Sequence, residues 1–533
     1  MNKFRAFLIL LILLAAQTVF AGGSSASAGN NQAAAGKPSH ANLTFTMWGD
    51  EPDAMSSVLA EFEKRTSDTL NISIKMLWTP VSDYANKLRL MLSSGEQIDS
   101  CFDASWVALQ DFASRGVYAS LDKYFDNPQY PGLLNFDDVL LQNNMFTSSD
   151  GKHIYAIPLV QAVGDAVNGY MIRKDLREKY NIPPIKTLSD LESFFDVILK
   201  NEPGMVPLAA SGTGEQMQML YTQFPSMKNN PDSLLWQIPV ASAMVGVAEL
   251  APDRKSVVNF YMIGDPRRVQ GYWFSQEQFT KAREWYVKGY VDKDILSKTG
   301  ADMQNAFTSG RAAVMESGTP NYLTRKPALL SAVPNAQVDF WVHTDEIRNM
   351  QPHAKPTNFL ANNFQCIPVT SKNIDRTMAF YNWLFSSQDN HDLFEYGIQG
   401  IHWIPQGSDL YSIPQGAPKY NFNGYKLTWN RNYVRFPADL DPDIINYIKY
   451  TQKIDSYYMD PFTGFTAYTE NIKTEIARIL PIFQEAQFTS MAGVNPDPRA
   501  ALDGYYAKMM DMGLQKIYDE MINQLNAFLA KKK

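Results

Sequence analysis

The chain has 533 residues, of which 45% are hydrophobic and 19% are charged, and its formal net charge is −7. Its length predicts more than one domain, because a domain usually has roughly 100–200 residues. The 48 basic residues against 55 acidic ones argue against a nucleic-acid partner, since binding to phosphates needs a clustered positive surface that releases counterions.

Residues 1–21 have the layout of a secretory signal. Lys3 and Arg5 precede an apolar run at 6–16, and Ala21 is the kind of small residue that signal peptidase cuts after. The run is too short to span a bilayer comfortably. We therefore expect cleavage after Ala21 and a periplasmic or secreted mature protein. No cysteine lies near this cut, so a lipid anchor has no acceptor there.

A leader at residues 22–40, rich in Gly, Ser, Ala and Asn, is predicted to be flexible. After it, strand and helix patterns alternate. Strands are expected at 43–48, 72–78 and 98–102, with helices at 55–62 and 84–91 between them. This order predicts a parallel sheet with right-handed crossovers.

Polar and aromatic residues follow the predicted strands, at the edge where parallel sheets bind ligands. These loops hold Trp48, Asp50 and Glu51, then Trp78, then Asp103, Ser105 and Trp106. An indole ring can stack on the C–H face of a sugar, while carboxylates and hydroxyls pair with its hydroxyl groups. The set predicts a carbohydrate site, although each ring could instead pack between helix and sheet.

Further candidates lie in a second α/β region and beyond it. Tyr170 is expected to face the cleft, and Glu215 lies in a glycine-containing turn that matches no dinucleotide or phosphate fingerprint. Asn362 and Asn363 stand at a predicted lobe boundary, and Trp403 lies in a loop rich in Gly and Pro. For each, a structural role is the alternative to a ligand contact.

The end of the chain has a different pattern. Residues 475–483 and 514–528 keep the apolar spacing of helices, which predicts a C-terminal helical subdomain.

The cysteines and histidines indicate no metal, redox or cofactor site. Cys101 and Cys366 have no CxxC spacing, and both a disulfide and two free buried thiols stay open. The six histidines form no HExxH, and no G-x-S-x-G is present. A glycosidase needs only two suitably placed carboxylates, which sequence spacing does not reveal, so hydrolysis stays an alternative.

Several motifs together resemble the family 1 extracellular solute-binding proteins of ABC importers. They are FTMWG at 45–49, GKHIYAIP at 151–158, NGYMIRKDL at 168–176, FTSGRAAVM at 307–315 and YGIQGIHW at 396–403. The last resembles a subgroup with an extra C-terminal helical domain. The resemblance implies a type II periplasmic-binding-protein fold, in which two α/β lobes are joined by a hinge.

From this resemblance we expect lobe 1 at 41–167 and 316–363, lobe 2 at 168–315 and 364–455, and the helical subdomain at 456–533. The hinge crossings are expected near 165–172, 311–318 and 362–368.

The implied function is the substrate-binding component of an ABC importer. Such a protein, expected to be a monomer without cofactor or catalytic activity, captures a sugar or oligosaccharide between its lobes and delivers it to a permease in the inner membrane. A peptide or other polar oligomer is the alternative ligand, because fold does not dictate substrate. An exported glycoside hydrolase is the second alternative.

Overall fold

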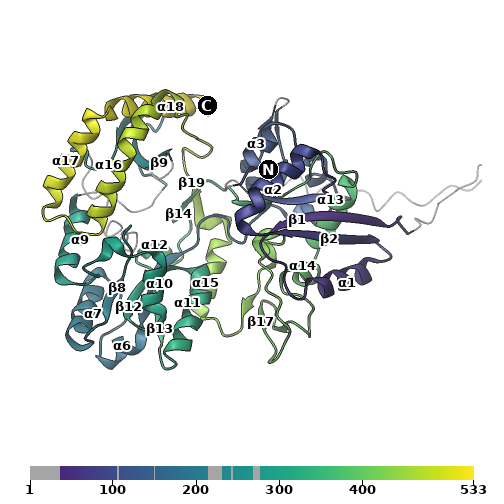
Figure 1. Ribbon diagram of the computed structural model, residues 1–533, viewed down its shortest axis with the longest axis horizontal. Coiled ribbons are helices and arrows are strands. Elements are labelled where there is room, and N and C mark those ends of the chain that lie inside the picture. The colour runs from purple at the N-terminus through teal and green to yellow at the C-terminus, as the bar shows by residue number, and fades with distance from the viewer. Residues whose placement is uncertain are drawn as a thin grey trace, which may run out of the picture. The chain divides into compact units, whose positions relative to one another are not determined.

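The computed structural model describes residues 37–104, 107–148, 151–213, 231–241, 244–267 and 276–532 (Figure 1). Within these ranges, no helix combines the length and the apolar character needed to cross a membrane. The predicted signal segment lies outside the described residues.

The first lobe is built on a five-stranded sheet of order β2-β1-β3-β15-β6. Its strands are β1 (Ala41–Trp48), β2 (Ile72–Thr79), β3 (Ser100–Ala104), β6 (Ala156–Leu159) and β15 (Asn363–Cys366). β1 runs parallel to β2 and β3, whereas β15 is antiparallel to both β3 and β6. The predicted alternation of strands and helices from β1 to β3 is confirmed. It could be predicted because the spacing of apolar residues along the chain depends directly on whether a segment is a strand or a helix.

Helices cover this sheet through aromatic packing. They are α1 (Met55–Thr66), α2 (Val81–Ser94), α3 (Leu109–Ser114), α4 (Asp122–Phe125), α5 (Asp138–Asn143), α13 (Ile374–Leu384) and α14 (Gln388–Glu395). Alternate residues of β1 point into one core, where the Phe45 ring lies 5.3 Å from that of Phe380 on α13. Phe62 of α1 meets the same Phe380 ring at 5.5 Å, so helices from distant parts of the chain share one core.

The second lobe has a four-stranded sheet of order β13-β7-β12-β8. Its strands are β7 (Asn168–Arg173), β8 (Val206–Ala209), β12 (Ala312–Gly318) and β13 (Val338–Trp341). The helices around it are α6 (Lys174–Lys179), α7 (Leu188–Asn201), α9 (Gln276–Lys288), α10 (Gly300–Thr308), α11 (Thr319–Ala332), α12 (Asp345–Arg348) and α15 (Pro442–Thr451). Helix α7 begins with a capping box between Thr187 and Asp190, which satisfies its first backbone donors.

The expected lobe boundaries are wrong in two places. Residues 316–341, assigned to lobe 1, contain the end of β12 and all of β13, and both strands pair with β7 in the second sheet. Residues 364–395, assigned to lobe 2, contain β15, α13 and α14, which belong to the first lobe. The expected lobe 2 segment 364–455 also contains α15, which does belong to lobe 2, because Ile444 of α15 lies in the core of that lobe. The sequence of an apolar strand does not show which sheet the strand joins, because its partner strands come from distant segments of the chain.

The chain passes between the two sheets at 160–167, 342–362 and 438–441. The expected crossing near 165–172 overlaps the first of these. The expected crossings at 311–318 and 362–368 are wrong, since they coincide with β12 and β15 inside the sheets. Within the crossing at 342–362, β14 (Lys355–Thr357) pairs in parallel with β19 (Tyr457–Met459).

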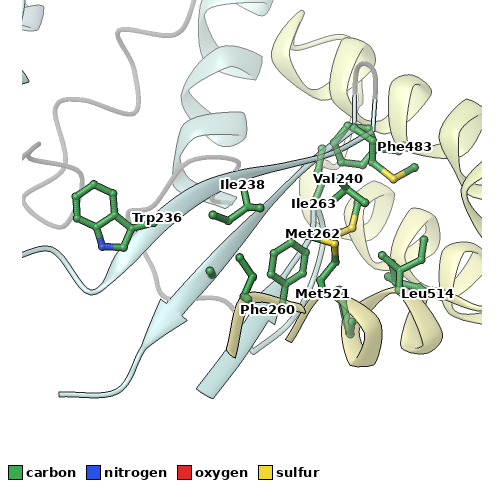
Figure 2. Close-up of a cluster of buried hydrophobic side chains, with 14 of the residues drawn as sticks. Trp236, Ile238, Val240, Phe260, Met262, Ile263, Phe483, Leu514 and Met521 are labelled. Carbon is green, nitrogen blue, oxygen red and sulfur yellow. The ribbon is translucent and has the colours of Figure 1, made fainter. Parts of the chain in front are cut away.

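A third subdomain combines the C-terminal helices with a sheet from the middle of the chain. The helices are α16 (Lys473–Met491), α17 (Pro498–Asp511) and α18 (Leu514–Lys531). The antiparallel sheet contains β9 (Leu235–Ala241), β10 (Met244–Leu250) and β11 (Val257–Tyr261). Figure 2 shows their shared core, in which Ile238 and Phe260 of the sheet and Phe483 and Met521 of the helices belong to one buried cluster. The expected helices are therefore present, but they do not form a subdomain alone.

Short elements complete the fold. They are β4 (Phe146–Ser148), β5 (Gly151–His153), β16 (Ile404–Gln406), β17 (Leu410–Ser412), β18 (Phe436–Pro437) and the 3-10 turns at Leu133–Asn135, Ile295–Ser297, Gly424–Lys426, Arg431–Tyr433, Ile454–Ser456 and Glu470–Ile472.

The two cysteines are free and buried. Cys101 and Cys366 stand opposite each other in the β3–β15 pair, inside an apolar cluster. Of the two alternatives left open by the sequence, the structure has the free thiols, which pack as small hydrophobic side chains.

The shared core of the third subdomain predicts a large effect for Phe483→Ala. Truncating a fully buried phenylalanine should lower the free energy of unfolding by about 3–5 kcal/mol. Val258→Ala, at a side chain on β11 that is 49% exposed, should change it by less than about 0.5 kcal/mol. Chemical denaturation followed by circular dichroism checks both, and equal effects would contradict a core shared by sheet and helices.

Candidate ligand-binding site

A cavity of about 610 Å³ lies where the chain crosses between the lobes, and we call it the hinge cavity. Its lining comes from 159–166, the start of α11 at Thr319, Pro320 and Leu323, 356–358, 360–363, Trp429, Ile448, Thr451 and Asp460. Both lobes contribute, because β6 ends at one wall and α11 begins at another. A ligand held there would contact both lobes and the crossings themselves.

Most polar groups in this cavity are uncharged hydroxyls and amides. The predicted residues Asn362 and Asn363 line it, beside Gln161, Asn358 and Thr319. Such groups both donate and accept hydrogen bonds, as the hydroxyls of a sugar require. The charged residues of the lining are the carboxylates Asp165 and Asp460.

A row of aromatic rings extends from the cavity wall into the first lobe, and we call it the aromatic row. Trp429 lies in the wall, and the Tyr425 ring is 5.8 Å from it at 73°. The Trp48 ring lies 6.0 Å from Tyr425, and its Nε1 donates to the Tyr425 hydroxyl at 2.9 Å. Trp48 also stacks on Phe102 at 5.9 Å. Trp48 therefore lies at the inner end of the row and does not line the hinge cavity.

Sequence reasoning missed Tyr425 and Trp429. The segment NGYKLTWN at 423–430 alternates aromatic and polar residues outside any regular strand or helix, and that density of aromatics was the available signal. It follows no strand of the first sheet directly, so the rule about strand ends did not select it.

Lys426 connects Trp78 to the aromatic row, although Trp78 does not line the hinge cavity. The Lys426 ammonium lies 5.2 Å from the centre of the Trp78 ring and 5.9 Å from that of Tyr425, within the range of a cation–π contact. Burial lowers the pKa of Lys426, and the charge of nearby Asp50 opposes this effect. Gly49, with φ of +90°, leaves room for the amine, because a Cβ there would lie 2.9 Å from Nζ. Glu51, like Asp50, is exposed.

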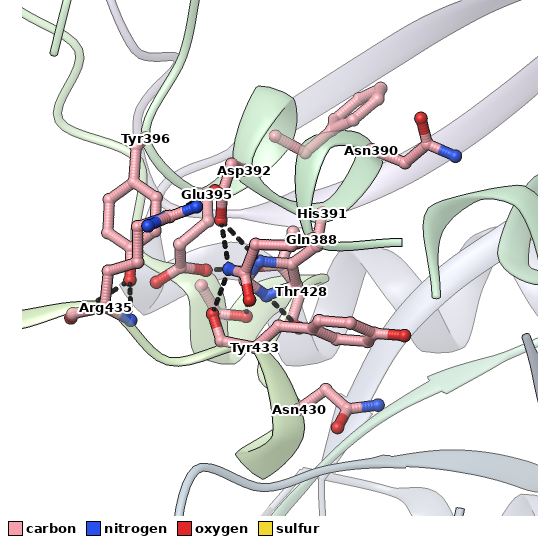
Figure 3. Close-up of polar contacts among 12 residues, drawn as sticks. Gln388, Asn390, His391, Asp392, Glu395, Tyr396, Thr428, Asn430, Tyr433 and Arg435 are labelled. Atoms are coloured by element: carbon pink, nitrogen blue, oxygen red, sulfur yellow. Dashed lines mark hydrogen bonds and ion pairs between the residues drawn. The ribbon is translucent and has the colours of Figure 1, made fainter. Parts of the chain in front are cut away.

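A buried polar cluster on α14 fixes the segment that carries the aromatic row (Figure 3). Arg435 donates from Nε to Asp392 at 2.6 Å, and His391 Nε2 lies 3.1 Å from the Thr428 carbonyl oxygen. Asp392 and His391 are almost fully buried. Charge-assisted hydrogen bonds in such surroundings hold geometry firmly, so this cluster positions Tyr425 and Trp429 without touching the cavity.

Asp103 has a supporting position. It is buried at the end of β3, where it accepts hydrogen bonds from the Tyr118 hydroxyl at 2.6 Å and from the backbone of Ala104 and Ala108. Burial raises the pKa of Asp103 to about 6, and these hydrogen bonds oppose the rise. These bonds join the end of β3 to Ala108 at the start of α3, and Asp103 is absent from the lining of the hinge cavity.

The remaining predicted site residues are not brought together here. Tyr170 is buried in the core of the second lobe, where its ring lies 6.2 Å from that of Trp341. Trp403 is buried and donates from Nε1 to the Gly397 carbonyl at 3.0 Å. Ser105, Trp106 and Glu215 lie outside the described residues. Over the described part of the chain, no cluster of His, Cys, Asp and Glu is suited to hold a metal ion.

Two family models match the chain. The model for bacterial extracellular solute-binding proteins matches residues 57–418, and a domain of unknown function (DUF3502) matches 461–530. A carbohydrate ABC transporter substrate-binding protein of Streptococcus pneumoniae is 25% identical over 91% of this chain and 90% of its own length.

Solved structures share the fold. The N-glycan transport solute-binding protein of Streptococcus pneumoniae matches with a TM-score of 0.66 and 22% identity, over 92% of this chain and all of the neighbour. A human-milk-oligosaccharide (HMO) binding, ABC-transporter-associated protein of Bifidobacterium longum infantis matches with a TM-score of 0.62 and 13% identity, over 92% of this chain and 99% of its own.

Asp103 gives the lobe a pH-dependent stability. The ordinary pKa of 3.8 is raised to about 6 in the folded state, which therefore holds the proton more tightly than the unfolded chain. The resulting stabilisation is complete below about pH 4 and is lost as the pH rises through 6. Asp103→Asn should reduce the change in unfolding free energy over this interval by about 3 kcal/mol. Denaturation at several pH values measures it. Asp83→Asn, at an exposed carboxylate of α2, should leave the curve as in the wild type.

Proposed function

Because the chain belongs to the family of bacterial extracellular solute-binding proteins, we propose that it is the substrate-binding component of an ABC importer and captures a sugar or oligosaccharide in the hinge cavity. The family membership confirms the resemblance drawn from the motifs. The observation that carries the ligand class is the hinge cavity itself, lined by amides and hydroxyls and joined at Trp429 to the aromatic row.

The chemistry of the lining favours a neutral polyol. Trp429 offers an apolar face for a sugar ring, while Asn358, Asn362 and Asn363 offer paired donors and acceptors for its hydroxyls. The relatives support the same class, since their names refer to carbohydrate, N-glycan and milk-oligosaccharide ligands.

The proposed mechanism is closure about the crossings at 160–167, 342–362 and 438–441. A ligand that contacts both lobes stabilises the closed form only through contacts that the open form lacks. The lining from α11 and α15 would supply such contacts on the second lobe. The closed form would then be recognised by the permease in the inner membrane, with the protein acting outside that membrane as a monomer and without a cofactor.

The aromatic row predicts specific losses of affinity. Trp429→Ala should raise the Kd for a bound oligosaccharide roughly tenfold, since a stacked ring contributes about 1–1.5 kcal/mol. Trp48→Ala should also raise Kd, because Trp48 holds Tyr425 of the row by a hydrogen bond and a ring contact. Isothermal titration calorimetry with Man1GlcNAc, Man5GlcNAc and maltohexaose measures it. Tyr468→Ala, at an exposed aromatic outside the hinge cavity, is the matched control and should leave Kd unchanged.

Two results would contradict this proposal. Wild-type protein that binds oligopeptides and none of the saccharides would move the ligand to the peptide class. Unchanged Kd values in both tryptophan variants would remove the aromatic row from the site.

A pure receptor leaves its ligand intact. We expect no new reducing ends after prolonged incubation of the purified protein with the same oligosaccharides, because the proposed role needs no bond cleavage. A reducing-end assay alongside an active glycosidase as positive control checks this. Release of reducing ends that rises with protein concentration would support the hydrolase alternative instead.

A further inference from the structure

The C-terminal subdomain meets the hinge cavity at Asp460, the last lining residue along the chain. We propose that Asp460 contacts the ligand by accepting a hydrogen bond from a saccharide hydroxyl, and that the C-terminal subdomain holds Asp460 in position to do so. This inference rests on the proposed function. The family model for the C-terminal segment describes a domain of unknown function, and this proposal gives it a part in ligand recognition.

On its N-terminal side, Asp460 follows a strand that belongs to the hinge and to the subdomain at once. The Tyr457 hydroxyl donates to the backbone carbonyls of Asp165 and Thr451, both at 3.2 Å, in the region of the crossings. The next residue, Tyr458, points into the core of the subdomain, where its ring lies 5.9 Å from that of Trp236. Neighbouring side chains on opposite faces of β19 therefore connect the two regions.

On its C-terminal side, Asp460 is followed by a turn anchored in the same core. Phe462 is buried there, and Thr463 donates from both its backbone and its hydroxyl to the Asp460 carbonyl, at 3.0 and 2.7 Å. Lys532, just after α18, donates from Nζ to the Pro461 carbonyl at 2.9 Å. The backbone N–H of Asp460 itself donates to the Thr357 carbonyl of β14 at 3.1 Å.

The carboxylate has one oxygen engaged and one available. Oδ1 accepts from the Phe462 backbone N–H at 2.7 Å. Among the residues that the structure describes, Oδ2 takes part in no hydrogen bond or ion pair. A carboxylate that is partly removed from water and lacks a donor gains more from a new hydrogen bond than one in water. A ligand hydroxyl in the hinge cavity would supply that donor.

The surroundings of Asp460 determine its pKa, and with it the pH dependence of ligand binding. Burial raises the pKa of Asp460, and the Lys532 ammonium opposes the rise. Two further charged groups lie near Asp460: Asp165 on the lining of the cavity, and Lys355 of β14, whose Nζ donates to the Ala166 carbonyl at 3.1 Å. A hydroxyl donor favours the ionised carboxylate, so ligand binding should tighten as the pH rises through the pKa of Asp460.

The decisive variant is Asp460→Asn. The asparagine oxygen can still accept from Phe462, but an amide donor replaces the free Oδ2 acceptor, so Kd for the tightest saccharide of the three probes should rise roughly tenfold or more. Asp519→Asn is the control, because it removes the same charge from an exposed position on α18, where the carboxylate accepts a hydrogen bond from the Gln515 amide. It should change Kd less than about twofold. Thermal unfolding of both variants verifies that the subdomain is folded.

A pH series separates contact from mere structural support. The wild-type Kd should fall as the pH rises through the pKa of Asp460, and Asp460→Asn should abolish this dependence. Lys532→Ala, which removes the neighbouring cation, should shift the midpoint to higher pH, since the pKa of Asp460 would rise further. A change in folding alone would shift no such midpoint.

The outcomes are distinguishable. If the wild type binds a saccharide and Asp460→Asn binds it equally well with the same pH profile, this inference is overturned while the proposed function stands. If the wild type binds none of Man1GlcNAc, Man5GlcNAc and maltohexaose, the proposed function and this inference are both overturned.

Discussion

The antiparallel pairing of β3 with β15 is the constraint on which the rest of the molecule depends. It joins two distant parts of the chain in the first sheet, and buried Gln365 secures it. The Gln365 side chain accepts from Ser100 at 2.7 Å and from Tyr381 at 3.0 Å, and donates to the Lys426 carbonyl at 2.5 Å. Because every polar atom of this buried amide is paired, it connects the sheet, α13 and the segment of the aromatic row in one network.

This pairing explains where the site lies. Since the first lobe is completed by a strand from late in the chain, the backbone has to leave it and return, and the crossings gather at one place. The hinge cavity forms among those crossings, so a ligand in it contacts the segments that lobe closure would move. The ends of β6 and β15 bring Leu159 and Asn363 to the same wall. Binding and hinge motion therefore share the same residues.

The C-terminal subdomain, like the first lobe, is completed by segments that are far apart in the chain. Its helices bury their apolar faces against a sheet that leaves the second lobe between β8 and α9, so neither segment completes the core without the other. The match to the domain of unknown function covers only the helical segment, 461–530. Through β19 and Asp460 this composite subdomain reaches the hinge cavity, which links its folding to the geometry of the site.

The sequence by itself determined the elements whose signals are local. The alternation from β1 to β3 and the C-terminal helices could be predicted, because the period of apolar residues depends on neighbouring positions. The assignment of Trp48 and of Asn362 and Asn363 to a ligand site stays a prediction, although both asparagines line the hinge cavity. Only the tertiary structure decided which sheet received β13 and β15, that Tyr170 and Trp403 are buried in cores, and that Trp429 reaches the hinge cavity. These outcomes depend on contacts between distant segments, whose pairing energies no local pattern encodes.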